Sequence, residues 1–294
     1  MSCLALGLAG VFSLFRAEAG ESAPCRLIQT IALPNVKGRI DHLAADVEGR
    51  RLFVCALGNN SVEVVDLKLA KQVQSIQGLG APQGVAYIPQ LGRLVAANDE
   101  GGRVNFYEGR DLRPAGVVDL KDDADNVRYD AQSKRVYVGY GSGAVAILDP
   151  SSAQLVGSIG LTAHPESFQL ERGGSRIFAN VPEAGEVVVL DRRQRKTLAR
   201  WSTGGAAANF PMALDEKNAR LFIGCRRPAR LIVLDTAAGK VVASLGISGD
   251  VDDIFYDAER KRIYAICGAG MIDVIKQRDA DHYQIDGAIR TAAG

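Results

Sequence analysis

The sequence contains six copies of a unit of roughly 42 residues, and this repeat limits the possible folds more than any single residue does. Each copy carries an arginine followed by two apolar residues, of which the second is often aromatic. The six arginines, 41 to 44 residues apart, are Arg51, Arg93, Arg135, Arg176, Arg220 and Arg262. A repeat of this length with short runs of strand-forming residues is typical of an all-β propeller that has one four-stranded blade per unit.

The first unit shows why each copy predicts a blade. Short apolar or alternating runs occupy residues 42–46, 51–56, 61–66 and 72–76, and turn-forming residues separate them. Four strands joined by tight turns form an antiparallel meander. A single small sheet would leave both of its faces in water, so we expect the sheets to pack against one another around an axis.

The two ends of the repeat array bear on the number of blades. Residues 26–31 resemble a fourth strand and precede the first complete unit, while the sixth unit has its own fourth strand near residues 283–289. This arithmetic predicts a seven-bladed ring whose last blade is incomplete in this chain, with six complete units. The alternative is a six-bladed ring with a spare strand.

Composition supports one ordered domain over residues 20–294. The chain is 47% hydrophobic and 23% charged, which is enough apolar material for a sizeable core. Its net charge of +1 gives no general attraction to nucleic acid or to acidic membranes. Basic residues cluster at 192–196 and at Arg226, Arg227 and Arg230, but no aromatic residues alternate with them. We therefore interpret both clusters as solvated turn charge and do not expect nucleic-acid binding.

Residues 1–19 have the character of a signal peptide. An uncharged apolar stretch is followed by Arg16 and by the small-x-small sequence Ala17-Glu18-Ala19, although a basic segment before the apolar stretch is missing. We expect an N-terminally incomplete signal peptide, export to the periplasm or the medium, and no membrane span in the mature chain. Cys25, Cys55, Cys225 and Cys267 would remain, and we expect free thiols, with pairing left open.

The repeat resembles the YVTN-type β-propeller repeat of secreted bacterial proteins. The resemblance is carried by residues 134–138 (Lys-Arg-Val-Tyr-Val) and 58–66 (Gly-Asn-Asn-Ser-Val-Glu-Val-Val-Asp), and it extends over roughly residues 26–290. It implies the propeller fold and export, and it says little about function.

Candidate functional residues lie nine and ten positions before the repeat arginines, at the start of each first strand. Because the first strands surround the axis, polar side chains there should converge at the mouth of the channel. The candidates are Asp41, His42, Gln83, Asp125, Asn126, Glu166, Asp252 and Asp253, together with Asn209, which precedes the fifth pair; His164 lies nearby. The ring predicts a site for a divalent cation such as Ca²⁺, or for a polyhydroxylated or cationic small molecule.

The metal ligands of this prediction are Asp41, Asp125, Glu166 and Asp252. The competing interpretation is a polar lining without a ligand, because strand starts favour Asp and Asn and a water-filled channel must be polar.

Other acidic residues recur in most blades, and this regularity indicates a structural role in turns. One set lies five residues before the repeat arginine and the other ends the third strands. The two sets are Asp46, Asp130, Asp215 and Asp257, and Asp66, Asp149, Asp191 and Asp235.

Two functions remain from the sequence. Nucleophile-elbow, P-loop and His-Glu-x-x-His motifs are absent from the sequence, which favours binding over catalysis. The first hypothesis is an exported, monomeric, non-catalytic propeller that binds an unknown small molecule, metal or protein partner at the channel mouth. The alternative is a divalent-metal-dependent hydrolase of lactones or esters, with axial carboxylate ligands.

Overall fold

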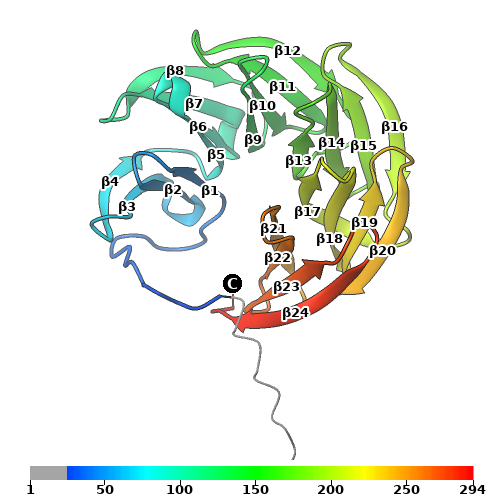
Figure 1. Cartoon of the computed structure of the whole chain (residues 1–294). Helices are drawn as coiled ribbons and strands as arrows, with labels where there is room; N and C mark the ends of the chain where they lie inside the picture. Colours follow the sequence, from blue (N-terminus) through cyan, green and yellow to red (C-terminus); the bar gives the residue numbers. More distant parts are fainter. Residues whose placement is uncertain (1–24, 294) are drawn as a thin grey trace, which may run out of the picture.

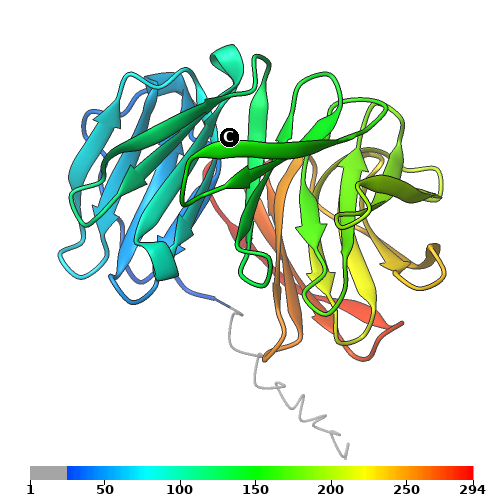
Figure 2. The same ribbon diagram turned by 90° about the horizontal axis from the view of Figure 1, so that it is seen from above.

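The computed structural model describes residues 25–293, which form six four-stranded antiparallel sheets arranged around a central axis. Figure 1 shows the ring face-on, and Figure 2 shows it turned by 90°. Each sheet is a simple meander of four consecutive strands, as the repeat predicted. The architecture is therefore a six-bladed all-β propeller, and the seventh, incomplete blade that the sequence predicted is not present among these residues.

Blades 1 to 3 comprise β1 (Leu43–Asp46), β2 (Arg51–Ala56), β3 (Ser61–Asp66) and β4 (Lys71–Gln77); β5 (Pro82–Ile88), β6 (Arg93–Asn98), β7 (Arg103–Glu108) and β8 (Arg113–Asp119); β9 (Ala124–Asp130), β10 (Arg135–Tyr140), β11 (Ala144–Asp149) and β12 (Gln154–Gly160). Blades 4 to 6 comprise β13 (Phe168–Leu170), β14 (Arg176–Val181), β15 (Glu186–Asp191) and β16 (Lys196–Ser202); β17 (Ala207–Asp215), β18 (Arg220–Arg227), β19 (Ala229–Asp235) and β20 (Lys240–Gly246); β21 (Val251–Asp257), β22 (Arg262–Cys267), β23 (Met271–Gln277) and β24 (Tyr283–Arg290). Three short 3-10 turns, η1 (Leu57–Asn59), η2 (Pro89–Leu91) and η3 (Glu100–Gly102), connect strands of the first two blades.

The core consists of apolar layers between neighbouring blades. Alternating side chains of one blade meet those of the next, so each layer combines two sheets. Five such clusters join blade 1 to 2, 2 to 3, 3 to 4, 4 to 5 and 5 to 6, and Phe53, Phe106, Phe178 and Phe222 are buried in them. Within residues 25–293 no comparable cluster joins blade 6 to blade 1.

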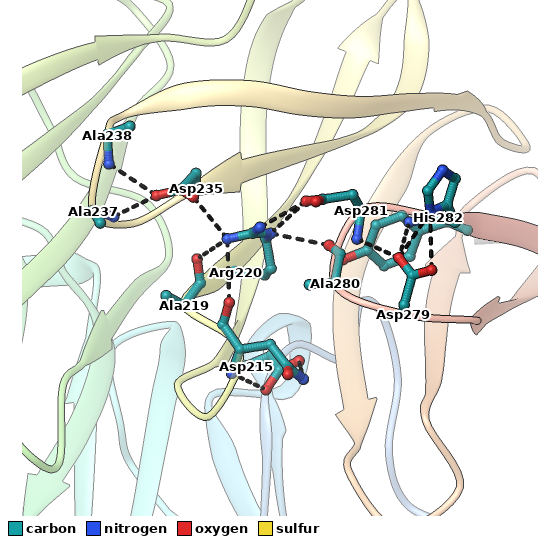
Figure 3. Close-up of polar contacts among 12 residues, drawn as sticks. Asp215, Ala219, Arg220, Asp235, Ala237, Ala238, Asp279, Ala280, Asp281 and His282 are labelled. Atoms are coloured by element: carbon teal, nitrogen blue, oxygen red, sulfur yellow. Dashed lines mark hydrogen bonds and ion pairs between the residues drawn. The ribbon is translucent and has the colours of Figure 1, made fainter.

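The recurring aspartates stabilise turns, as the sequence predicted. The Oδ1 atom of Asp235 accepts hydrogen bonds from the backbone N–H groups of Ala237 and Ala238, at 2.7 and 2.8 Å. Its Oδ2 atom accepts from Nη1 of Arg220 at 2.9 Å, and the same guanidinium reaches the Asp281 carboxylate of the next blade (Figure 3). Asp66, Asp149, Asp191 and Asp257 accept two N–H groups in the same way.

All six repeat arginines form ion pairs with carboxylates. The repeat motif therefore specifies blade geometry, which explains why it recurs in every unit.

Residues 26–31 differ from the prediction, because they form no strand. The side chains of Leu27 and Ile28 are 84% and 83% exposed. Every blade already contains its own fourth strand, so this segment has no third strand to pair with. In Figure 1 it runs, in dark blue, between the ends of the ring formed by blades 6 and 1.

The predicted signal peptide, residues 1–19, lies outside the described residues. No helix of the described part is long and apolar enough to cross a membrane. The four cysteines between residues 25 and 293 are free thiols, as expected, and Cys55, Cys225 and Cys267 are buried.

Candidate functional site

The first strands of the blades surround an axial cavity of about 310 Å³. All six blades contribute to its wall, including His42, Gly84, Arg128, Gln169 and Asp253. Gly84 is required at its position, because a Cβ atom there would collide with the backbone carbonyl of Asp125 on the neighbouring strand. The first strands therefore converge on the axis, and His42 and Asp253 lie on the wall of the cavity.

Local pairing places His42 on the wall of this cavity. Residues 41 and 42 continue the pairing of β1 with β2, because the N–H of Asp41 donates to the Cys55 carbonyl at 2.8 Å and the N–H of Cys55 donates to the His42 carbonyl at 3.0 Å. The Nδ2 group of Asn126 lies 3.2 Å from Nε2 of His42. In this orientation of the Asn126 amide its nitrogen donates to Nε2, which accepts as part of a neutral ring.

The surroundings of His42 keep it neutral at physiological pH. Burial lowers the pKa of His42 to about 4; Asp253 opposes this shift, whereas Arg128 and Arg39 add to it. Oδ1 of Asp125 is 3.7 Å away and Oδ1 of Asp41 is 4.0 Å away, and neither makes a hydrogen bond to the ring. The imidazole is thus an acceptor fixed by Asn126 and not a cation that neutralises the carboxylates.

Asp125 and Asn126 are two of the three predicted site residues that have a buried side-chain oxygen without a partner among residues 25–293, and the third is Asn209. The side chains of Asp125 and Asn126 belong to β9, and the residues are 5% and 2% exposed. Oδ1 of each has no hydrogen-bond partner among residues 25–293. Burial raises the pKa of Asp125 well above its usual value, and repulsion from Glu166, Asp41 and Asp123 adds to this effect.

Further carboxylates surround the mouth. Burial raises the pKa values of Asp41, Asp123, Glu166 and Asp252. Asp123 accepts a hydrogen bond from Nε2 of Gln83 at 3.1 Å and lies 3.7 Å from Nδ1 of His164. The mouth is therefore acidic, and its carboxylates share too few donors to lower their pKa values.

Asn209 has a different environment from the other predicted residues. Its Nδ2 group donates to Oδ1 of Asn180 at 3.0 Å and to the Glu186 carbonyl at 2.9 Å, and the residue is fully buried. These contacts join blades 4 and 5, so the position of Asn209 gives it a role in blade packing.

Arg226 and Arg128 were missed by sequence reasoning. Arg226, interpreted as solvated turn charge, forms ion pairs with Asp250 and Asp252 and lies 4.2 Å above the ring of Phe210. Arg128 lines the cavity. Alternation along β9 could have identified it, because residues 126 and 128 of a strand point to the same side.

The predicted divalent-cation site stays a prediction. Asp41, Asp125, Glu166 and Asp252 lie near the same mouth, but in the described part of the chain no three His, Cys, Asp or Glu side chains are grouped as metal ligands. The donor set of the mouth instead combines single carboxylates with amides, two histidines and two arginines.

No family model and no curated protein matches this chain.

Proposed function

We propose that this protein binds a small organic cation, such as a protonated amine, at the mouth of its axial channel, and that it does so without catalysing a reaction. The observation that carries the proposal is the pair of acceptors Asp125 Oδ1 and Asn126 Oδ1, which are buried and have no donor among residues 25–293. A buried acceptor without a donor costs about 1–3 kcal/mol. Neither oxygen is exposed in this structure, so both side chains have to turn toward the channel for a ligand to donate hydrogen bonds to them and recover this free energy.

Charge supports a cation over a neutral polyhydroxylated molecule. Burial is the main reason that the pKa of Asp125 is raised, and repulsion from the Glu166 and Asp41 carboxylates raises it further. A positive charge among them relieves this repulsion. In a channel that is only polar, a water molecule can donate a hydrogen bond to one acceptor. Water cannot neutralise the negative charge of the carboxylates at the mouth.

The test is thermal unfolding and isothermal titration calorimetry of the full chain with primary amines, diamines, polyols and divalent metal salts. A ligand that binds only the folded state at a hundredfold excess over Kd stabilises it by about 2.7 kcal/mol. We expect amines to bind and polyols to have little effect. Asp125→Asn should abolish amine binding, whereas the control Asp119→Asn, at an exposed ion pair with Lys121, should retain it.

Binding of no amine would contradict the proposal. Binding of calcium, magnesium or manganese that Asp125→Asn and Glu166→Gln both abolish would instead favour the alternative, a metal-dependent hydrolase, and would make lactones and esters the substrates to test.

We also propose that the chain is an exported member of the YVTN-type propellers, which the apolar stretch at residues 1–19 and the repeat motif support. Expression in a bacterial host, followed by cell fractionation and N-terminal sequencing, tests export. Mature protein that begins at Gly20 in the periplasm or medium is expected, and intact protein in the cytoplasm would contradict it.

A further inference from the structure

The face of blade 6 that points away from blade 5 lacks the cover that the matching face of every other blade has. Two positions after each repeat arginine, a side chain enters the apolar layer shared with the following blade. In blades 1 to 5 these side chains are at most 3% exposed, and they are Phe53, Val95, Tyr137, Phe178 and Phe222. Tyr264 has this position in blade 6, but it is only half-buried and belongs to none of the five layers of residues 25–293.

Strand pairing extends this face around Tyr264. Residues directly opposite one another in an antiparallel sheet point to the same side. Tyr264 lies opposite Phe255 of β21 and Val274 of β23, and Phe255 is 57% exposed. The next row consists of three half-buried isoleucines, Ile266, Ile272 and Ile289. These six residues form a contiguous apolar surface across four strands, which we call the outer face of blade 6.

The outer face of blade 6 is bulkier than the faces that pack against a following blade. In three other blades the residue opposite the corresponding side chain is alanine, namely Ala44, Ala86 and Ala213. In blade 6 this residue is Phe255. Aromatic side chains are enriched in the cores of interfaces between proteins, so an exposed phenylalanine here favours contact with another molecule.

Residues 26–31, which run between the two ends of the ring in Figure 1, do not cover the outer face of blade 6. The side chains of Leu27 and Ile28 are 84% and 83% exposed. The other end of the array differs, because Val54 and Val65 of blade 1, which point away from blade 2, are each 3% exposed. Among residues 25–293, the array therefore has an uncovered apolar surface at its blade 6 end.

Opposite charges lie at the two ends of the outer face of blade 6. Asp253 of β21 is opposite Ile266 at one end, and Lys276 of β23 is opposite Arg262 at the other, roughly 13 Å away along the strand. The remaining charges of this face are paired with one another or with Arg260, whereas Asp253 and Lys276 form no ion pair within the described chain. A two-fold rotation exchanges the two ends, so it brings the acidic end of one face over the basic end of an identical face.

We propose that the outer face of blade 6 binds the same face of a second copy of this chain, in a two-fold symmetric dimer. Such a dimer uses one self-complementary patch on both subunits, and this face combines an apolar centre with opposite charges at its ends. Four strands of about five residues measure roughly 15 by 17 Å. A standard interface buries roughly 800 Å² per partner, so the dimer should be weak enough to dissociate on dilution.

The dimer does not depend on the proposed ligand, and it departs from the monomer expected from the sequence. Asp253 and Phe255 also line the axial cavity. The second copy would therefore border this cavity.

Sedimentation velocity of the full chain between about 1 and 500 μM tests the dimer, because an interface of less than standard size should dissociate in this range. We expect the mass of one chain at the lowest concentration and of two chains at the highest. Phe255→Asp should move association to concentrations at least about tenfold higher. Val117→Asp is the matched control, because Val117 is 51% exposed on the outer strand of blade 2, and it should associate like the wild type.

Exchange of the two charges tests the two-fold arrangement. Asp253→Lys and Lys276→Asp should each weaken association, because each places like charges opposite one another. The double variant restores both attractive pairs with reversed signs. It should therefore associate about as well as the wild type.

A wild-type chain that stays monomeric at the highest concentration would overturn the proposal. A dimer that persists in Phe255→Asp would also overturn it, because another surface would then form the interface. Should Phe255→Asp fail to fold, Ile289→Lys on the outermost strand of the same face decides the same question. A double charge variant that associates no better than the single variants would overturn the two-fold arrangement.

Discussion

Aspartates in the turns and aspartates at the channel mouth belong to the same blades, and they differ in what satisfies them. Asp235 accepts two backbone N–H groups and an arginine, and these contacts lower its pKa. Asp125 is more deeply buried, has one oxygen without a donor, and has a raised pKa. The fold itself satisfies the turn aspartates, whereas the channel aspartates lack partners that a ligand can supply.

The largest predicted loss of stability comes from a variant of the turn contacts. Arg220 is 8% exposed and connects Asp235 in blade 5 to Asp281 in blade 6. Removing one partner of a buried ion pair leaves the other charge unpaired, and the exposure of Asp281 reduces the loss, so Arg220→Ala should cost about 2–3 kcal/mol. Chemical denaturation measures this as a lower midpoint.

The matched control for Arg220 is Arg260→Ala, whose ion pair with Asp257 stays within one exposed turn. Its midpoint should equal that of the wild type. Equal midpoints for both variants would remove the distinction between turn contacts that join blades and those that do not.

The next effect concerns the pH dependence of stability at the channel. The pKa of His42 is about 4 in the folded protein and 6.5 in the unfolded chain, so between these values the unfolded chain binds more protons. Stability should therefore fall as pH decreases from 6.5 to 4, by an amount on the order of 2 kcal/mol. His42→Gln should flatten this profile in denaturation experiments.

His282→Gln is the control for this profile. His282 is exposed and lies in a turn beside Asp279. The variant should keep the acid slope of the wild type, and a slope that survives in His42→Gln would assign it to other groups.

A smaller change in stability, of opposite sign, distinguishes the aspartates of the channel mouth from those of the turns. The raised pKa of Asp125 means that its ionised form destabilises the folded protein as pH rises above about 3.8. Asp125→Asn should therefore be more stable than the wild type at neutral pH, by about 1 kcal/mol, with the difference vanishing in acid. It should lose ligand binding at the same time.

Asp257→Asn should behave in the opposite way. Backbone N–H groups and Arg260 lower the pKa of Asp257, so its charge stabilises the fold at neutral pH and loses this effect as pH falls. Thermal unfolding of both variants at neutral and acidic pH shows whether each substitution raises or lowers the stability. A loss of stability in both at neutral pH would remove the contrast.

The smallest effect is expected in residues 26–31, which belong to neither region. Leu27 and Ile28 are exposed and unpaired, so Leu27→Ser and Ile28→Ser should change the free energy of unfolding by less than about 0.5 kcal/mol. A loss similar to that of a buried strand residue would show that this segment pairs in solution. Cys55→Ser, in the buried second strand of blade 1, provides the contrast.

Local patterns in the sequence determined the repeating architecture. The strands and turns predicted for residues 42–76 agree with blade 1. The turn aspartates accept hydrogen bonds from the backbone N–H groups two and three residues further along the chain, as expected. The strands, turns and turn aspartates depend on contacts between residues that are close in the chain. Because they recur in every repeat unit, a single sequence is enough to recognise them.

Only the tertiary structure decided which side chains meet and which stay without partners. Asn126 meets His42 across 84 positions of sequence, Arg128 lacks the carboxylate that every repeat arginine has, and Arg226 pairs with Asp252. Residues 26–31 look like a strand in isolation, but a strand needs a neighbour with free backbone groups. Which side chains pair, and whether a segment forms a strand, depends on distances between separate blades. The spacing of residues along the chain does not give these distances.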